Sequence, residues 1–302
     1  MNSRDGIRAQ AGPRTAAKTA KATACLLKRQ YLYLGLLLGA ATLSPTAQAI
    51  NSALEMKAIY ADTVEQQLLP PDEEVLAYGD MMLASLANAG IKNLPPQFIV
   101  LVDRNPKVQA AMLFWLDSEG VPQLIGASPV STGRAATGFE HFETPVGVFS
   151  HSITNLDYRA EGSKNSKGIR GYGAKGRRVF DFGWQPAKKG WGDKQIAPMR
   201  LQMHATDPDF LESRLGSMQS KGCVRIPATL NKLLDHYAVL DAEYDTSIAE
   251  GKNFWVLEKD RQENAWAGRY MVVVDSGREQ RPEWSHYIAR KTAKSTQITA
   301  SR

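Results

Sequence analysis

The chain has 302 residues, 43% hydrophobic and 23% charged, which is typical of a folded protein and excludes a fibre or a disordered tail. Its formal net charge of +6 comes from residues 1–49, where seven basic residues accompany one acidic residue. The remaining chain carries 30 basic and 30 acidic residues. Overall charge therefore gives no reason to expect a nucleic-acid partner.

Residues 1–49 have the three parts of a secretory signal. A basic stretch ends at residues 28–29, an apolar run covers 31–43, and small residues follow at 47–49. The apolar run is shorter than the roughly 20 residues that span a bilayer as a helix. We therefore expect cleavage after Ala49 and an exported protein of the periplasm or cell wall, without a membrane span.

Cysteine usage narrows the role of the remaining thiol. Cys25 precedes the apolar run, where a lipid-attachment cysteine does not stand, and it would be lost with the leader. Cys223 is then the single cysteine of the exported protein, so no internal disulfide can form. It is a buried core residue, half of an intermolecular disulfide, or a nucleophile.

Secondary structure is predicted to change at two proline pairs. A helical segment is expected over 50–96, interrupted at residues 70–71 and ended at 95–96, and packed on the domain that follows or used to bind a partner. Beyond it, β-rich runs alternate with turns, so we expect a mainly β domain of the α+β class. The expected strands cover 98–102, 111–116, 123–130, 146–150, 201–204, 254–257 and 270–274, and a helix covers 227–239 with His236 on its polar side. The last 25 residues are polar and are expected to fray.

Residues 157–200 hold eleven basic residues against four acidic ones, together with eight glycines and several aromatic residues. The segment is either a solvated surface loop, or a lid or groove wall whose cations meet an acidic ligand and whose aromatic rings supply apolar contact. Under the second interpretation, four cations are expected to hold a carboxylate-rich substrate: Lys164, Lys167, Arg170 and Arg177.

The residues around Cys223 combine a nucleophile with a base. A thiol attacks as the thiolate, and an imidazolium or a helix N-terminus lowers its pKa; His204 and the expected helix after residue 227 supply both. Gly222 allows close backbone approach, so its amide and that of Cys223 would stabilise an oxyanion. Arg225 holds a substrate carboxylate, balances the thiolate, or only braces the loop. Ser220 likewise donates a hydrogen bond at the site or shapes the turn.

The segment resembles the catalytic domain of the L,D-transpeptidases, the YkuD-type fold, whose motif is a His followed at this kind of distance by Ser-x-Gly-Cys, a hydrophobic residue, and Arg or Asn. Here 15 residues separate His204 from the run at 220–225, which reads Ser-Lys-Gly-Cys-Val-Arg. Two upstream runs also match, Val-Ser-Thr-Gly at 130–133 and Thr-Pro-Val-Gly-Val-Phe at 144–149. The resemblance spans residues 97–258 and leaves 259–302 as a C-terminal strand and flexible tail.

The resemblance implies that Cys223 attacks the amide between the third and fourth residues of a peptidoglycan stem peptide. His204 would take the thiol proton, the backbone carbonyl of Ala205 would orient the imidazole, and no cofactor is needed. The resulting thioester would pass to an amine of a second stem peptide, to a lysine of an outer-membrane lipoprotein, or to water. Many members have Gly where this chain has Ala205, and His where it has Lys221. Lys221 cannot take over acid–base chemistry, and we group it with the substrate-binding cations.

Other classes fit less well. Papain-like peptidases place the Cys before the His, and a sortase would need His141 or His151 as its base, farther upstream than His204. A zinc peptidase would need a ligand set that His204, Asp207 and Asp209 do not match, so no metal is expected. The alternative from another class is a non-catalytic wall-binding module, in which the basic segment binds and the cysteine is incidental.

Overall fold

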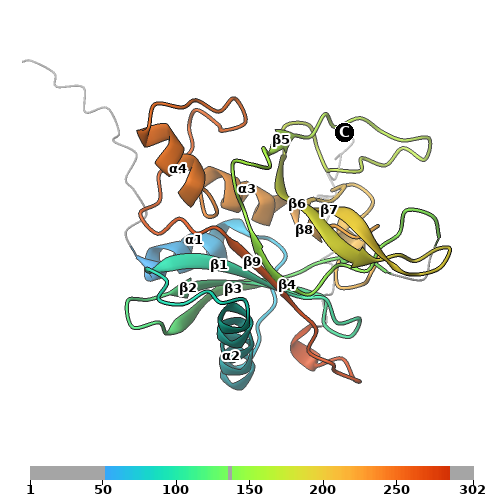
Figure 1. Ribbon diagram of the computed structural model, residues 1–302, viewed down its shortest axis with the longest axis horizontal. Coiled ribbons are helices and arrows are strands. Elements are labelled where there is room, and N and C mark those ends of the chain that lie inside the picture. Colours follow the sequence, from blue (N-terminus) through green and yellow to red (C-terminus); the bar gives the residue numbers. More distant parts are fainter. Residues whose placement is uncertain (1–51, 135–137, 286–302) are drawn as a thin grey trace, which may run out of the picture. The chain divides into compact units, whose positions relative to one another are not determined.

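A computed structural model describes residues 52–134 and 138–285 (Figure 1). Two sheets and four α-helices within these residues form an α+β fold that is mainly β, as the sequence predicts. The expected leader and its cleavage after Ala49, and the part of the expected tail beyond 285, lie outside the described residues. None of the described helices combines the length and the apolar content that crossing a membrane requires.

Two helices begin the described chain, as the proline pairs predict. Helix α1 (Ala53–Thr63) begins at Ser52, whose side chain accepts a hydrogen bond from the Glu55 amide at 3.0 Å and so caps the helix. Helix α2 (Asp72–Asn88) follows Pro71 and has three acidic residues in its first turn, where they interact favourably with the helix dipole. Both helices bury apolar side chains on the sheet, which is the packing role expected of this segment.

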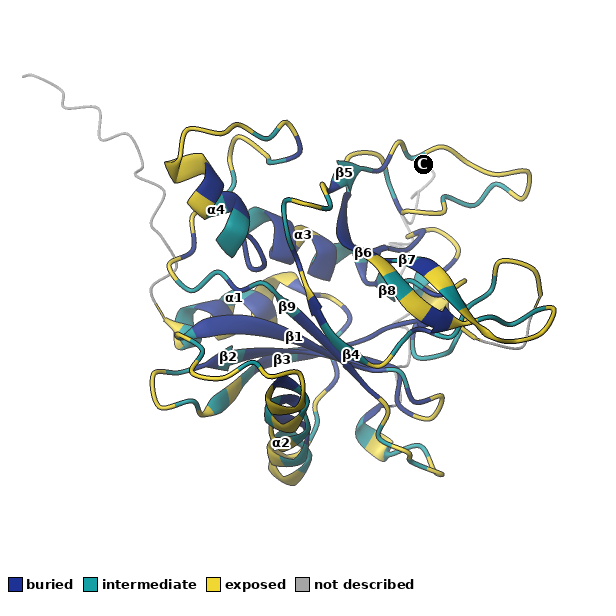
Figure 2. Cartoon of the chain, in the orientation of Figure 1, coloured by how far each residue is buried: buried dark blue, intermediate teal, exposed yellow. Residues whose placement is uncertain are grey.

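The first sheet has the strand order β3-β2-β1-β9-β4. Its strands are β1 (Gln97–Asp103), β2 (Ala110–Leu116), β3 (Pro122–Pro129), β4 (Gly147–Ser150) and β9 (Tyr270–Val274). Strand β9 comes from the segment expected to follow the catalytic domain, yet it lies between β1 and β4. Every residue of β1 is buried, as Figure 2 shows.

Alternating residues of β1 enter two separate cores. Phe98 and Val100 pack in a core that includes α1 residues and the second sheet, whereas Ile99 and Leu101 pack in a core that includes α2 residues. The sheet is therefore covered on both faces, with α1 and α3 on one side and α2 on the other (Figure 1). This explains why its central strands are continuously apolar.

The second sheet carries the residues of the motif and has the order β5-β6-β7-β8. Its strands are β5 (Tyr158–Arg159), β6 (Arg178–Lys188), β7 (Ile196–Ala205) and β8 (Val224–Ile226), and the 3₁₀ turn η1 (Glu212–Arg214) lies between β7 and β8. Helices α3 (Ala228–His236) and α4 (Ala242–Ala249) follow β8. The strand predicted over 254–257 is wrong, because a turn closes there with the Leu257 amide bonded to the Phe254 carbonyl at 3.2 Å.

The C-terminal residues up to 285 pack on the domain, although they were expected to fray. Arg281 donates to the Gly216 carbonyl at 2.8 Å, and Trp284 meets Tyr78 of α2 edge to face at 5.8 Å between ring centroids. The short 3₁₀ turn η2 (Glu283–Ser285) ends in the fully buried Ser285. Arg281 and Trp284 thus fix this polar segment against the domain.

A buried ionic network joins the second sheet to the helices beside it. Arg178, fully buried at the start of β6, contacts Asp157 and Asp241 at 2.7 Å each and Asp235 at 3.4 Å. Asp157 also lies 2.9 Å from the Nε2 atom of buried His151. Charges taken out of water need such partners, and each member here has at least one.

Candidate active site

The parallel pairing of β7 with β8 places the motif residues on one face of the second sheet. Met203 pairs with Val224, and both enter the core, so their neighbours His204 and Arg225 project from the opposite face. Cys223 directly precedes Val224 and shares that face. Its thiol donates to the Arg200 carbonyl of β7 at 3.8 Å. The nucleophile and base expected from the sequence thus lie on adjacent strands.

His204 is held in one orientation and in one tautomer. Its Nδ1 atom lies 2.7 Å from the Ala205 carbonyl oxygen, the group that the resemblance implies for this purpose. A carbonyl only accepts, so the neutral ring carries its proton on Nδ1 and leaves Nε2 as the acceptor. Burial, together with the nearby Arg225 cation, lowers the pKa of His204 to about 4. The imidazole is therefore a neutral base at physiological pH.

The resting thiol differs from the activated thiolate that the sequence suggested. Burial raises the pKa of Cys223 to about 11, even though Arg225 acts in the opposite direction. Strand β8 separates Cys223 from α3, which begins at Ala228, so the helix expected directly after the cysteine starts only beyond that strand. Since His204 is neutral, it supplies no imidazolium either. At rest, the nucleophile and the base are thus a neutral thiol and a neutral imidazole on adjacent strands.

The two upstream motifs support the loop that carries the cysteine. Ser131 and Arg225 exchange two backbone hydrogen bonds of 2.9 Å each. The Thr144 hydroxyl accepts from the Gly133 amide at 2.8 Å and donates to the Gly222 carbonyl at 2.6 Å. A Cβ atom on Gly133 would stand 2.5 Å from Gly222 Cα, so only glycine permits this approach. Runs that lie far apart in the sequence therefore converge on residues 220–225.

Ser220 and Gly222 shape the turn before the cysteine. The Ser220 hydroxyl donates to the Cys223 carbonyl at 2.6 Å and accepts from the Gly222 amide at 3.0 Å. Of the two roles considered for Ser220, the contacts correspond to shaping the turn. Gly222 has a φ of 137°, and a Cβ there would lie 2.2 Å from Met199 Sδ. The Gly222 amide donates within the turn to Ser220, so of the two amides expected to face an oxyanion the Cys223 amide is the better candidate.

The cations expected to hold substrate fall into three groups. Arg170 is paired with Asp209 at 2.6 Å, and Lys221 with Glu140 at 3.2 Å, so these two cations would have to exchange an ion pair in order to bind substrate. Lys164 and Lys167 are exposed and Arg177 is half-buried, all within the segment between β5 and β6. Arg225 alone of the six is a residue of the cysteine face.

Arg225 keeps an unused donor. Its Nη1 atom donates to the Gln219 carbonyl at 3.2 Å, but its Nε atom is buried and has no hydrogen-bond partner among the described residues. Buried donors are nearly always satisfied, so an orphaned one beside a reactive group points to a ligand. Arg225 remains the candidate for a substrate carboxylate.

Residues 157–200 divide into an exposed segment and a hairpin that contributes to the core, and the core part was not expected. Residues 160–177, here called the lid segment, bring Tyr172 edge-on to His204 with 4.7 Å between ring centroids. A cavity of about 460 Å³ opens beside it, lined in part by Tyr158 and Trp255. The remainder of the segment is the β6–β7 hairpin, whose Phe180 and Phe182 are buried core residues and not a solvated loop.

Sequence reasoning missed Tyr172, Arg200 and Gln202 as residues of this face. Arg200 and Gln202 precede His204 by four and two positions on β7, so strand alternation alone would have placed them with it. For Arg200 that signal was lost because the strand was expected to begin only at residue 201, whereas Gln202 lay inside the expected strand and was overlooked.

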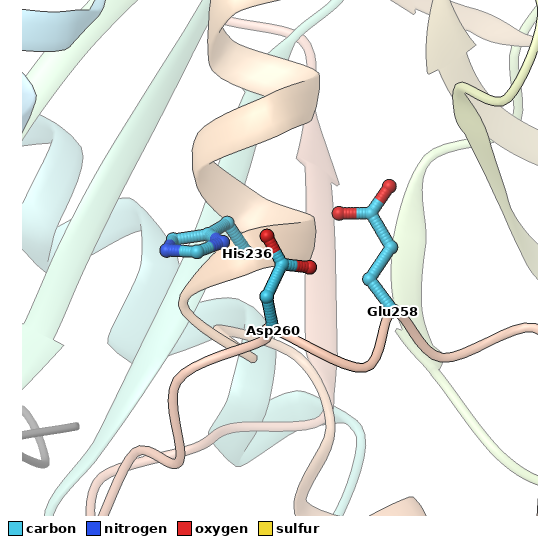
Figure 3. Close-up of side chains that lie close together, drawn as sticks. All are labelled: His236, Glu258 and Asp260. Carbon is cyan, nitrogen blue, oxygen red and sulfur yellow. The ribbon is translucent and has the colours of Figure 1, made fainter. Parts of the chain in front are cut away.

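One His and carboxylate cluster in the described residues has ligand atoms close enough for a metal ion. His236, Glu258 and Asp260 offer atoms within 4.8 Å of one another near the end of α3 (Figure 3). Both carboxylates are exposed, and Glu258 also lies 3.4 Å from Arg159. Exposed carboxylates of this kind are common without an ion, so the cluster carries no metal assignment. Asp207 and Asp209, considered earlier as ligands, instead accept from Arg170.

Comparisons with known proteins add two remote structural similarities. No family model and no curated protein matches the chain. Two solved structures of the helical cell shape determining protein Pgp2 from Campylobacter jejuni, one of a point mutant, match with 16% identity and a TM-score of 0.28 each. The matches cover 67% and 68% of this chain but only 56% and 58% of Pgp2. This chain thus spans little more than half the length of Pgp2, and we infer neither fold nor function from so low a score.

Proposed function

We propose that this protein is an exported cysteine acyltransferase of the L,D-transpeptidase type, acting on peptidoglycan stem peptides in the periplasm or cell wall. The observation that carries the proposal is the pairing of β7 with β8, which puts Cys223 and the Ala205-oriented His204 on one face. The motif runs that resemble this family also pack against the cysteine loop. Neither a metal nor a cofactor is part of the proposed reaction.

In the first half-reaction, Cys223 Sγ attacks the substrate carbonyl carbon while His204 Nε2 takes the thiol proton. Because the pKa of the thiol is raised to about 11 and that of His204 is lowered to about 4, proton transfer accompanies C–S bond formation and no thiolate forms beforehand. The Cys223 amide donates to the oxyanion. The C–N bond then breaks, and the leaving amine takes the proton from His204.

In the second half-reaction, an acceptor amine attacks the thioester and gives its proton to His204 Nε2. The C–S bond breaks and the proton returns to sulfur, which restores the neutral pair. With an amine of another stem peptide the product is a cross-link, and with a lipoprotein lysine it is an attached protein. Arg225, with its unpaired Nε donor, would hold a substrate carboxylate next to the reacting bond.

A second outcome, hydrolysis, is favoured by one observation. Tyr172 covers His204, which is only 3% exposed, so the path to the base is narrow in the resting structure. Water passes such a lid more easily than the amine of a second peptide strand. The same thioester resolved by water would make the protein an L,D-carboxypeptidase, or an amidase that releases wall-bound protein.

Mass spectrometry of muropeptides separates these outcomes. The purified protein is incubated with a disaccharide-tetrapeptide, beside Cys223→Ala and the control His236→Ala, which changes a histidine at the end of α3. Cross-linked dimers that have lost the terminal residue, formed by the wild type and His236→Ala only, would show transpeptidation. Tripeptide without dimers would show hydrolysis. No turnover in any variant, with wall binding intact, would replace the proposal by a non-catalytic binding module.

A further inference from the structure

The cysteine face extends beyond the motif along the β6–β7 hairpin. Arg200 and Gln202 alternate with the core residue Leu201, so they project from the same face as His204. Across the hairpin Gln202 pairs with Asp181, and Arg200 pairs with Trp184. The resemblance to the L,D-transpeptidases and the mechanism above use neither Arg200 nor Trp184.

Trp184 and Arg200 form an exposed aromatic and cationic pair. The guanidinium carbon of Arg200 lies 5.9 Å from the centroid of the Trp184 ring. Trp184 is 64% exposed. It follows a bulge, because the pairing of β6 with β7 shifts register between Asp181 and Trp184. Bulges commonly redirect a side chain near a functional site, and a large exposed aromatic residue is a frequent anchor for a ligand.

A buried carboxylate fixes the direction of the Arg200 guanidinium. Asp181 is fully buried and accepts from Arg200 Nε at 2.8 Å, from Gln202 Nε2 at 2.8 Å and from the Gly183 amide at 2.8 Å. The two terminal nitrogens of Arg200 have no partner among the described residues, and its side chain is 40% exposed. The guanidinium is therefore held at its inner edge and presents two parallel donors outward, the geometry that binds a carboxylate in bidentate fashion.

The pair lies on the side of the thiol away from the base. Val224 pairs with Met203, so Cys223 is level with Gln202, and Arg200 and His204 stand on opposite sides of it, each two residues or about 7 Å along β7 at the usual rise of a strand. In acyl transfer the base serves the leaving amine and the incoming acceptor, so these occupy the His204 side. The portion of the substrate that remains on sulfur then extends toward Arg200.

We propose that Arg200 and Trp184 form the acyl-donor subsite, in which Arg200 binds a carboxylate of the stem peptide and Trp184 packs on its apolar part. This inference rests on the proposed function for the identity of the ligand. In this proposal the Arg200–Trp184 subsite, and not the cations of the lid segment, mainly determines donor binding. The subsite binds stem peptides with a free carboxylate and binds amidated stem peptides weakly.

Binding measured without turnover tests the subsite. Isothermal titration calorimetry is performed in the Cys223→Ala background with the disaccharide-tetrapeptide and with the same compound amidated at its stem carboxylates. Arg200→Gln is expected to raise the Kd for the acid form at least 10-fold and to leave that for the amidated form within twofold. Trp184→Ala is expected to raise the Kd for both forms. Lys188→Gln, which changes an exposed cation on the same hairpin, is the matched control and is expected to leave both within twofold.

The outcomes separate this inference from the proposed function. Equal Kd values for Arg200→Gln and its background, equal losses for both ligand forms, or no binding by the background protein would each overturn the subsite. A separate reaction with Cys223 intact reports the thioester adduct by mass spectrometry. Selective binding without an adduct would refute the proposed function and retain the subsite. Thermal melts that match the background protein ensure that Arg200→Gln is folded.

Discussion

Two buried histidines of this protein have opposite charge states. His151 is 0% exposed and lies between two acceptors, the Leu240 carbonyl at 2.7 Å from Nδ1 and Asp157 at 2.9 Å from Nε2. Burial lowers its pKa, but the Asp157 carboxylate outweighs burial, so the pKa is raised overall. His204 has one acceptor and a neighbouring cation, Arg225, and its pKa falls to about 4.

Both histidines are buried, yet their pKa values shift in opposite directions, so burial alone does not determine the charge of a histidine. A ring that faces two acceptors must donate twice and stays an imidazolium, whereas a ring with one acceptor keeps a free lone pair. His151 is thus part of a structural ionic network with Asp157 and Arg178, while His204 is suited to accept a proton. The same side chain stabilises one region and supplies chemistry in the other.

The largest expected effect is on activity at His204. We expect His204→Gln to lower the rate of acyl-enzyme formation about 10²–10⁴-fold, because the proton acceptor is lost, while the protein stays folded. His151→Gln should show the reverse pattern, lower stability with the chemical step retained in the folded fraction. Stopped reactions followed by intact-protein mass spectrometry give the rates, and urea titrations give the stabilities. Similar activity losses in both variants would mean that the two sites are not distinct.

The next effect is on stability. Arg178→Met would leave Asp157 and Asp241 buried without their guanidinium, and we expect it to lower the free energy of unfolding by about 3–5 kcal/mol. Arg170→Met removes a partly exposed ion pair with Asp209 and a 3.6 Å contact with Asp207, whose carboxylate keeps its backbone amide donors, and should cost about 0–1 kcal/mol. Urea unfolding of both variants checks the difference. An Arg178→Met protein as stable as Arg170→Met would show that the network contributes no net stability.

Much of the fold followed from the sequence because its central strands are apolar and bounded by turns. Strand β6 escaped prediction because basic residues lead into it at positions 175–178, and Arg178 is buried only through acids distant in sequence. Helix α4 was missed in a similar way, since its polar residues gave little helical periodicity. The apolar run at 254–257 suggested a strand, but no strand of residues 52–134 or 138–285 pairs with it.

The features of the site that sequence spacing encodes were predicted, and those that depend on tertiary contacts were not. The spacing of His204 and Cys223 is local to the sequence, so the pair was found. The charge states of His204 and Cys223 were not predicted, because they depend on burial and on the position of Arg225, which pairs with His204 only in the folded sheet. The engagement of Arg170 by Asp209 likewise depends on contacts that no motif encodes.

The rate of alkylation of Cys223 tests whether the resting thiol is neutral. Because burial raises the pKa of Cys223 to about 11, we expect iodoacetamide at pH 8 to alkylate it about 100-fold more slowly than a free thiol, contrary to the activated thiolate suggested by the sequence. Arg225→Gln should slow the reaction further, since Arg225 lowers the pKa of this thiol. The urea-unfolded chain, reacting as a free thiol, is the internal reference. Alkylation faster than this reference would restore a thiolate and imidazolium pair.

The remaining expected effect, and the one that compares the two histidines directly, is the pH dependence of stability. For His204 the folded pKa of about 4 lies below the unfolded value of about 6.5, so the unfolded chain binds more protons between these values. Its contribution to stability therefore rises with pH across that window, by up to about 1.4 kcal/mol per pH unit, and is constant above it. His151, whose folded pKa is raised, contributes fully below the unfolded value and loses its contribution as pH rises through the folded pKa.

Difference curves isolate the two histidines from the carboxylates that titrate in every variant. Wild type minus His204→Gln, from urea unfolding at pH 4 to 9, should slope upward to about pH 6.5 and then become flat. Wild type minus His151→Gln should be flat at low pH and fall above about pH 6.5. Curves of the same sign would mean that partners do not set these charges, and the assignment of His204 as a neutral base would lose its physical foundation.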